Sequence, residues 1–317
     1  MGTYMIRRFF LMLLTLFGIS VLIFTMLRLV PGNIADIVFN AAGMIDVAEK
    51  VKLEKELGLD RPIPVQYFEW VSGLARGDLG YSYVSEKPAI DEILPRIPIT
   101  AKLAGLALLF AVTFGVPLGV ISAVKQNTTL DYVLRVVSLS GLSLPSFWLG
   151  LLILMAFVAY FGTIPIYTDP PRGFWNTLWL FSIPAAAVGF RSSALVMRLT
   201  RSSMLEVLRQ DYIRTARAKG APARTVNYRH ALRNAMLPVV TVIGLEFAFL
   251  IGGLVVTEQV FNLNGLGKLF VQAVTRSDFT MVQALVLLVA TFFIIVNFVI
   301  DLLYAWLDPR LRRTAVA

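Results

Sequence analysis

Few residues in this chain have the types and spacing that enzymatic chemistry requires. Cysteine is absent, which excludes a disulfide framework, a thiolate nucleophile and a cysteine metal site. His230 is the single histidine, so a histidine-ligated metal centre is not expected and an HExxH motif cannot form. The GxSxG turn that exposes a serine nucleophile does not occur either. We therefore expect no catalytic residue and no metal ligand.

The nearest approach to a phosphate-binding loop lies at residues 262–269. Such a loop needs Gly, four residues, Gly-Lys and then Ser or Thr, because its backbone N–H groups must surround the phosphates. Asn262 stands where the first glycine belongs, and Leu269 follows Lys268. ATP binding by this chain is therefore not expected.

Two charged residues inside long apolar runs have the chemistry to recognise a charged solute. A charged side chain at membrane depth costs at least about 2.5–3.5 kcal/mol, so it needs a compensating interaction or a role. Arg191 and Glu246 could line a water-filled path and contact a zwitterionic substrate. Alternatively, they could pair with each other across two helices, or Arg191 could extend to the membrane interface.

Small and polar residues at two other points extend this candidate path. Pro145 removes one backbone hydrogen bond, which the hydroxyl of Ser143 or of a neighbour can replace. The resulting kink would be either a gate hinge or a static bend. Gly252 and Gly253 allow helices to approach closely, or to slide between two arrangements. The candidate path residues are therefore Ser143, Pro145, Arg191, Glu246, Gly252 and Gly253.

Transmembrane helices must position these residues. Apolar residues make up 57% of the chain and charged residues only 15%, against about 25% in soluble domains. Six stretches reach the roughly 20 mainly apolar residues that a spanning helix needs. They are 9–30, 101–124, 136–161, 178–199, 237–261 and 281–306. We therefore predict an all-α membrane protein with six transmembrane helices.

The charges between these helices predict the orientation. Segment 198–236 carries nine Lys/Arg against two acidic residues, whereas segment 31–99 carries seven basic and eleven acidic residues. Basic residues collect in cytoplasmic loops, so both termini and the short basic tail are expected in the cytoplasm, with a large outer loop after the first helix. The net charge of +9 is then explained by topology and contact with membrane lipid, and no nucleic-acid partner is expected.

The outer loop suggests a division of the chain at residue 98. Residues 1–98 would hold the first transmembrane helix and the outer loop, and residues 99–317 would form a core of five helices with a long cytoplasmic loop at about 198–236. Residues 47–57 are expected to form a short surface helix that stops at Gly58. Residues 66–81, with aromatic residues beside glycines, are expected to form a packed cap at the outer mouth.

The loop after the fourth predicted helix has the pattern of a compact elbow. Apolar residues recur at helical spacing from Met204 to Ala216, with basic residues on the other face, which predicts an amphipathic helix. Gly220, Ala221 and Pro222 end this helix, and a second short helix is expected before Leu237. Such an elbow either docks against a partner or lies on anionic lipid.

Residues 211–238 (DYIRTARAKGAPARTVNYRHALRNAMLP) resemble the cytoplasmic signature of binding-protein-dependent ABC importer permeases, in particular the dipeptide/oligopeptide/nickel branch. The resemblance covers nearly the whole chain. Its other motifs follow in order: MIRRF at 5–9, LGLDRPIPVQ at 57–66, GDLG at 77–80, GLGKLF at 265–270 and LYAWLDPRL at 303–311. It implies the type I permease fold in a bacterial-type inner (plasma) membrane.

The resemblance also implies a coupling helix that sits in a groove on a separate ATPase. Its residues here are Arg217, Ala218, Lys219, Gly220, Ala221 and Pro222. The implied partners are a second homologous permease, two ABC ATPase subunits that hold ATP and Mg²⁺, and an extracytoplasmic substrate-binding protein. No cofactor is implied in this chain. The general signature starts with an acidic residue, but Arg214 stands there, so contacts made by that acidic side chain are not expected.

Two alternatives belong to other functional classes. An ion-coupled secondary transporter would be expected to show several paired intramembrane carboxylates or inverted repeats of broken helices, and Glu246 alone does not make such a pair. An intramembrane enzyme would need the catalytic constellations that are missing above. The cargo stays open at this point among peptides, nickel chelates, glutathione-like molecules and other small solutes.

Overall fold

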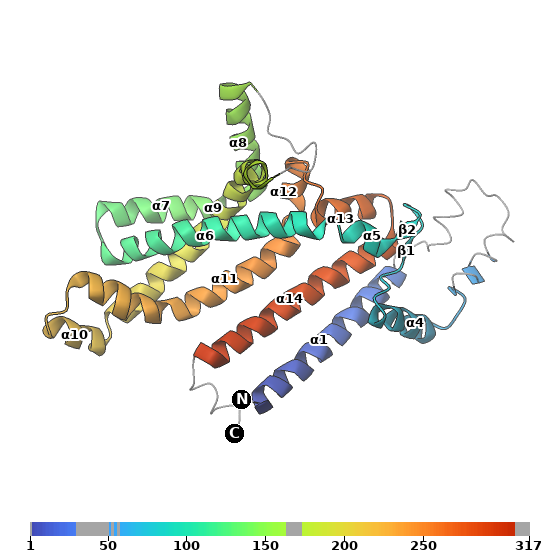
Figure 1. The fold of residues 1–317 in the computed structure, drawn as a ribbon, viewed down its shortest axis with the longest axis horizontal. Helices are drawn as coiled ribbons and strands as arrows, with labels where there is room; N and C mark the ends of the chain where they lie inside the picture. The colour runs from blue at the N-terminus through green and yellow to red at the C-terminus, as the bar shows by residue number, and fades with distance from the viewer. Residues whose placement is uncertain (1, 30–50, 52–53, 56–57, 163–172, 308–317) are drawn as a thin grey trace. The chain divides into compact units, whose positions relative to one another are not determined.

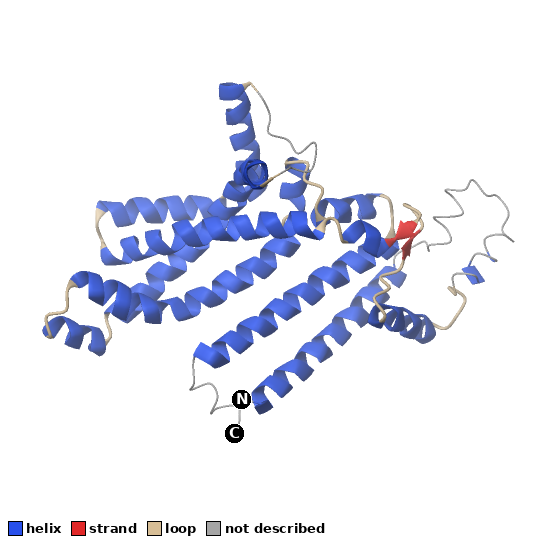
Figure 2. Ribbon diagram, in the orientation of Figure 1, coloured by secondary structure: helices blue, strands red, loops and turns tan. Residues whose placement is uncertain are grey.

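The computed structural model describes residues 2–29, 51, 54–55, 58–162 and 173–307, and within these ranges the side chains of residues 5–302. Almost all of these residues are helical, and the strands among them form one short antiparallel hairpin of β1 (Tyr81–Ser82) and β2 (Lys87–Pro88) (Figure 2). The prediction of an all-α protein is confirmed. Most of the expected surface helix at 47–57 lies outside the described residues.

Within the described residues, five helices are long and apolar enough to cross a membrane, and a sixth span results if one bent helix pair is counted as a single crossing. The long helices are labelled in Figure 1. They are α1 (Gly2–Leu29), α6 (Ile97–Val124), α9 (Phe174–Leu208), α11 (Arg233–Gly253) and α14 (Phe279–Leu307). The bent pair is α7 (Thr129–Ser143) and α8 (Ser146–Phe161).

The bend in the third predicted span is much sharper than a proline kink. The axes of α7 and α8 differ by 103°. Leu144 has extended backbone angles (φ −86°, ψ 131°), because a residue that precedes proline is driven away from the helical region. Pro145 is the N-cap of α8, which begins at Ser146, and at this position its missing N–H is not needed. Residues 136–161 therefore form two helices that meet at Leu144 and Pro145.

The internal contacts divide the chain into two compact units. The N-terminal unit contains residues 1–99 and 264–298, and the core unit contains residues 100–263 and 299–317. The internal contacts thus group segment 264–298 with the N-terminal residues, whereas the sequence-based division at residue 98 assigned it to the permease core.

Aromatic packing holds the N-terminal unit together on one side. Helix α4 (Ile63–Ala75) contacts α1 through Tyr67 and Trp70, whose ring centroids lie 5.4 and 5.7 Å from that of Phe24. The Ser20 and Tyr67 hydroxyls are hydrogen bonded at 2.7 Å. The part of the expected cap that falls in α4 is therefore packed against α1.

A second cluster in the same unit joins segments distant in sequence. Helix α5 (Ala89–Ile93) packs its buried Ile93 against α13 (Leu266–Thr275) and α14. Asp278 accepts a hydrogen bond from the Met281 N–H at the start of α14, and its carboxylate also accepts one from the Ser82 hydroxyl of the hairpin. The hairpin and the start of α14 are thereby tied together.

Helix α9 is the centre of the core unit and packs against α7, α8 and α11. Small residues bring α6 against it: a Cβ added at Gly115 would lie 2.8 Å from the Ser193 carbonyl oxygen, and one at Gly119 would lie 2.7 Å from that of Met197. Close approach of helices through small residues is typical of membrane proteins. The predicted fifth span breaks at Leu254, where α11 gives way to α12 (Val255–Val260).

Candidate functional site

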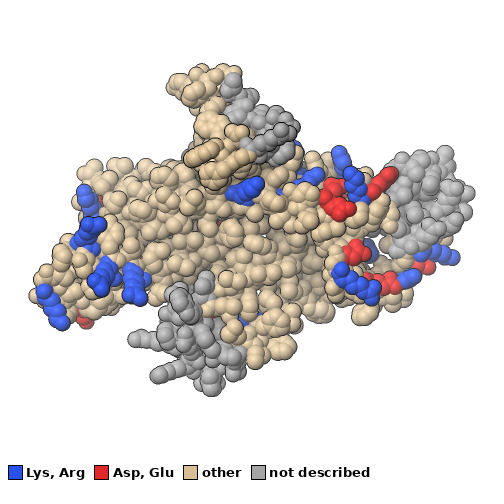
Figure 3. All heavy atoms as spheres, in the orientation of Figure 1, with Lys and Arg blue, Asp and Glu red and all other residues tan. Residues whose placement is uncertain are grey.

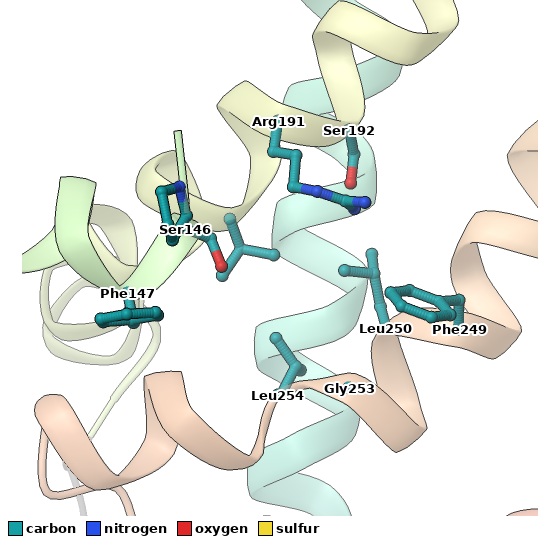
Figure 4. A pocket seen from close by; sticks show the side chains of 10 residues that line it. Ser146, Phe147, Arg191, Ser192, Phe249, Leu250, Gly253 and Leu254 are labelled. Carbon is teal, nitrogen blue, oxygen red and sulfur yellow. The ribbon is translucent and has the colours of Figure 1, made fainter. Parts of the chain in front are cut away.

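A pocket of about 240 Å³ lies in the core unit between α8, α9 and α11 (Figure 4). It is bounded by the start of α8, the middle of α9 and the end of α11. Its lining consists of Pro145, Ser146, Phe147, Val188, Arg191, Ser192, Phe249, Leu250, Gly253 and Leu254. Apart from Arg191 these residues are uncharged, so the pocket is an apolar and aromatic space with one fixed cation.

Arg191 reaches from α9 toward the α11 wall of this pocket, as Figure 4 shows. Its guanidinium carbon lies 5.8 Å from the ring centroid of Phe249, a distance at which a cation is attracted to the ring face. No carboxylate within the described residues forms an ion pair with Arg191. The side chain is half-buried, so the aromatic contact replaces only part of its solvation.

Glu246 has a different partner from the one that the sequence suggested. It is 8% exposed and accepts a hydrogen bond of 2.9 Å from the hydroxyl of Ser192, which itself lines the pocket. The pairing of Arg191 with Glu246, one of the alternatives raised by the sequence, is therefore not formed in this structure. Glu246 does not line the pocket itself, but it contacts the lining residue Ser192.

The backbone at the start of α8 contributes partial positive charge to the pocket. Pro145 is the N-cap, and among the described residues no side chain caps the start of this helix. The first N–H groups of a helix lack intrahelical acceptors and carry a partial positive charge. Ser146 and Phe147, which carry two of these groups, line the pocket. Both charge contributions in the lining are thus positive.

The structure brings together some of the candidate path residues and separates others. Pro145, Arg191 and Gly253 line the pocket. Ser143 is exposed and donates its hydroxyl to the Leu139 carbonyl at 2.9 Å, and exposed Gly252 lies outside the lining. The aromatic wall was missed by the sequence reasoning. Phe249 follows Glu246 by three residues and precedes Gly253 by four, a spacing that places all three on one helix face.

The elbow after α9 is built from three helical segments instead of the two that were predicted. Helix α9 continues to Leu208, the chain turns at Arg209 and Gln210, and α10 runs from Asp211 to Ala218. The helix expected from Met204 to Ala216 is therefore broken in its middle. After the turn, a π-helical segment η1 (Thr225–Leu232) continues directly into α11, so the expected second short helix is not separate.

The apolar face of α10 anchors it to the core unit. Ile213 is fully buried in a cluster with Met204 of α9, Val226 and Ala231 of η1, and residues of α6. The Asn234 amide donates to the Tyr212 hydroxyl at 2.7 Å across the elbow. The elbow is therefore a packed part of the core unit.

The tip of this elbow projects away from the cluster. Arg217, Ala218, Lys219, Gly220 and Pro222 are exposed, and Ala221 is half-buried. Gly220 has φ +79°, a left-handed conformation that closes the turn after α10 and that glycine adopts without strain. Figure 3 shows Lys and Arg side chains gathered at this end of the core unit.

A buried ion pair fixes the neighbouring α6–α7 turn to α9. Asp131 is fully buried and accepts hydrogen bonds from the Arg201 Nε and Nη2 atoms at 2.8 and 2.9 Å. It also accepts from the Ser122 hydroxyl at 2.5 Å and from the Asn127 N–H at 3.0 Å. These four bonds tie α6, α7 and α9 together at the end of α9 that leads into the elbow.

Comparison with protein families gives two matches that together cover most of the chain. Residues 115–313 match the family described as "Binding-protein-dependent transport system inner membrane component". Residues 1–104 match the N-terminal family of the same transport-system membrane component.

Curated proteins of known name match over nearly their whole length. The di/tripeptide transport system permease protein of Pseudomonas aeruginosa is 40% identical, covering 98% of this chain and 99% of that protein. The dipeptide transport system permease protein of Escherichia coli K12 is 39% identical over 98% of both chains. The glutathione transport system permease protein of the same strain is also 39% identical, over 98% of this chain and 99% of that protein.

A solved structure shares the fold. It is described as an amino acid ABC transporter with histidines, and it matches with a TM-score of 0.54 at 17% sequence identity. The match covers 67% of this chain and 92% of that one. At this identity the likeness concerns the fold alone.

Proposed function

Since this chain belongs to the family of inner membrane components of binding-protein-dependent transport systems, we propose that it forms one half of the translocation path of an ATP-driven peptide importer. The proposal depends most on one observation. Whole-length relatives at about 40% identity are named as permeases for dipeptides, di/tripeptides and glutathione. All three cargoes are short peptides with amide bonds and free carboxylates, so short peptides are the proposed substrate class.

The exposed tip of the elbow is the proposed contact with the ATPases. An elbow that transmits force from an ATPase to the membrane helices must be rigid, and it must be firmly attached to those helices. The buried anchor at Ile213 and the continuity of η1 with α11 meet this requirement. The residues proposed to sit in the ATPase groove are Arg217, Ala218, Lys219, Gly220, Ala221 and Pro222.

The wider assembly follows from this role. A second homologous permease completes the path, two ABC ATPase subunits hold ATP and Mg²⁺, and an outer substrate-binding protein delivers the peptide. The basic elbow and both termini face the cytoplasm, and segment 31–99 faces the binding protein. ATP-driven closure of the ATPases pushes the elbows together and opens the path outward, and hydrolysis resets it.

Reconstitution tests the function directly. The complete assembly is placed in liposomes with ATP inside and its binding protein loaded with radiolabelled dialanine outside. We expect uptake that requires hydrolysable ATP. Uptake by this chain alone, driven by an ion gradient without the ATPases, would instead establish a secondary transporter and overturn the proposal.

Replacing Gly220 by Val tests the coupling role. A β-branched residue at φ +79° is strained, although nothing in the structure lies within 4 Å of the added Cβ, so the distortion is confined to the turn. We expect ATP hydrolysis to continue while dialanine uptake falls by about tenfold or more, a loss equivalent to roughly 1.4 kcal/mol of coupling.

Gly162→Val is the matched control for this test. Gly162 also has a positive φ, +68°, and no atom of the described residues lies within 4 Å of an added Cβ, but this glycine follows α8. Its variant should keep uptake and hydrolysis in the wild-type ratio. Full uptake in Gly220→Val, or equal loss in both variants, would contradict the coupling role.

A further inference from the structure

We propose that the pocket between α8, α9 and α11 binds a carboxylate of the transported peptide, with the Arg191 guanidinium as its counterion. The inference rests on the proposed function, because it assigns the cargo's anionic group to a place in the path. It is carried by the pocket lining, which holds one cation, the start of a helix and no anion.

The cation in this pocket has its hydrogen-bonding capacity available for a ligand. A guanidinium offers five N–H donors in a planar fork that fits a carboxylate with two parallel hydrogen bonds. In the described part of the chain, the contact recorded for Arg191 is with the Phe249 ring, and a ring face occupies none of these donors in an N–H···O bond. A carboxylate can therefore bind Arg191 while the aromatic contact persists.

The neighbouring groups favour an anion in the same space. Two of the first residues of α8, Ser146 and Phe147, line the pocket, and no described side chain caps the start of that helix. Backbone N–H groups at a helix start attract anions. The Ser146 hydroxyl is a further donor in the lining. Apart from Arg191 itself and Ser192, whose hydroxyl is bonded to Glu246, the other lining side chains are apolar, and a charge interaction is stronger in such surroundings than in water.

Glu246 does not occupy the Arg191 guanidinium in this structure, although it lies close to the pocket in sequence and in contact with Ser192 of its lining. Its carboxylate is buried and bonded to Ser192, the residue next to Arg191 in α9. Among the described residues no ion pair joins Glu246 to Arg191. Because the Glu246 carboxylate is bonded to Ser192, a peptide carboxylate would not have to displace it in order to bind Arg191.

Thiol chemistry gives a test that separates charge from shape. The chain contains no cysteine, so Arg191→Cys introduces a single thiol. In the reconstituted assembly, we expect this variant to take up dialanine about tenfold more slowly or worse, the size of effect expected for a lost charge-assisted hydrogen bond. Treatment with 2-aminoethyl methanethiosulfonate, which restores a positive charge, should recover much of the loss. The 2-sulfonatoethyl reagent, which adds a negative charge, should not.

Two controls accompany the measurement. Lys102→Cys removes an exposed cation from α6 outside the pocket and should transport normally with either reagent. The wild-type assembly treated with both reagents reports on cysteines of the partner subunits. Purification of the intact assembly with each variant establishes that the variant folds.

The outcomes distinguish this proposal from the one on which it rests. ATP-dependent dialanine uptake by the wild type supports the proposed function whatever Arg191 does, and its absence overturns both. Wild-type uptake by Arg191→Cys, or equal recovery with both reagents, would overturn the carboxylate site alone. Recovery with the cationic reagent only would support it.

Discussion

At the scale of single residues, Asp131 and Arg191 differ in how completely other groups of the protein satisfy their charges. Asp131 is surrounded by four donors, including both nitrogens of a bidentate arginine contact. Arg191, by contrast, faces an aromatic ring and an open pocket. A fully satisfied charge stabilises one arrangement, whereas a charge that faces a cavity is available to a ligand. Asp131 is therefore a structural residue, and recognition of the cargo is the role that we propose for Arg191.

Replacing Asp131 by Asn should destabilise the protein strongly. The change removes one partner of a buried pair and leaves the Arg201 guanidinium, 17% exposed, without its carboxylate. Breaking such a pair costs about 3–5 kcal/mol. We expect a clear fall in the unfolding temperature in detergent, measured by fluorescence-detected size exclusion after heating.

Asp211→Asn is the control for that change. Asp211 contacts Arg214 at 3.4 Å, but its side chain is 94% exposed, and exposed pairs contribute little. Its unfolding temperature should match the wild type. Equal effects of the two substitutions would show that burial of Asp131 does not govern its contribution.

At the scale of elements, close helix crossings determine how the core unit packs. Gly119 on α6 leaves room for the Met197 carbonyl and the Thr200 side chain of α9. Gly189 on α9 does the same for the Ala107 carbonyl of α6. The two helices are therefore in close contact through glycines on both of them. Helix α9 continues from this crossing to the elbow.

Gly119→Ala should weaken this crossing. The new Cβ would lie 2.6 Å from the Thr200 Cβ and 2.7 Å from the Met197 carbonyl oxygen, so a helix must shift. Overpacking of this kind costs about 1–3 kcal/mol. Thermal unfolding of the purified protein should occur at a lower temperature.

Gly105→Ala makes the same substitution on the same helix where space is open. Nothing lies within 4 Å of a Cβ at this position. Because alanine favours helix over glycine, stability should be unchanged or slightly raised. A destabilised Gly105→Ala variant, or an unaffected Gly119→Ala variant, would contradict the crossing as the cause.

At the scale of the whole molecule, charge is distributed by segment. The basic residues of segment 198–236 include Arg217, Lys219 and Arg224, which are exposed, whereas segment 31–99 has more acidic than basic residues. Because loops rich in Lys and Arg stay on the cytoplasmic side, we expect these two segments to lie on opposite sides of the membrane. The proposed ATPase and binding-protein contacts require that arrangement.

Single-cysteine labelling tests the orientation. We expect Arg224→Cys to react with a membrane-impermeant maleimide only in inverted membrane vesicles, and Lys87→Cys to react from outside in intact cells with a permeabilised outer membrane. Both side chains are exposed, and the native chain has no cysteine to react. Labelling of both positions from one side would invert or abolish the proposed topology.

The sequence by itself determined which stretches are apolar and long enough to span a membrane, where basic residues collect, and that a turn occurs at Gly220. These properties depend on local composition and on backbone preferences of single residues. The order of short motifs also pointed to the importer family, which the whole-length comparisons confirm.

Only the tertiary structure decided which residues meet. It joined Pro145, Arg191 and Gly253 in one pocket, left Ser143 and Gly252 outside it, and gave Glu246 a serine partner. The structure also shows that the third predicted span is two helices at 103° to each other, and that the predicted elbow helix is interrupted at Arg209 and Gln210. Helical periodicity shows which residues share a face, but the neighbour of that face depends on long-range packing. For this reason the pocket and the buried pair of Asp131 could not be derived from local sequence patterns.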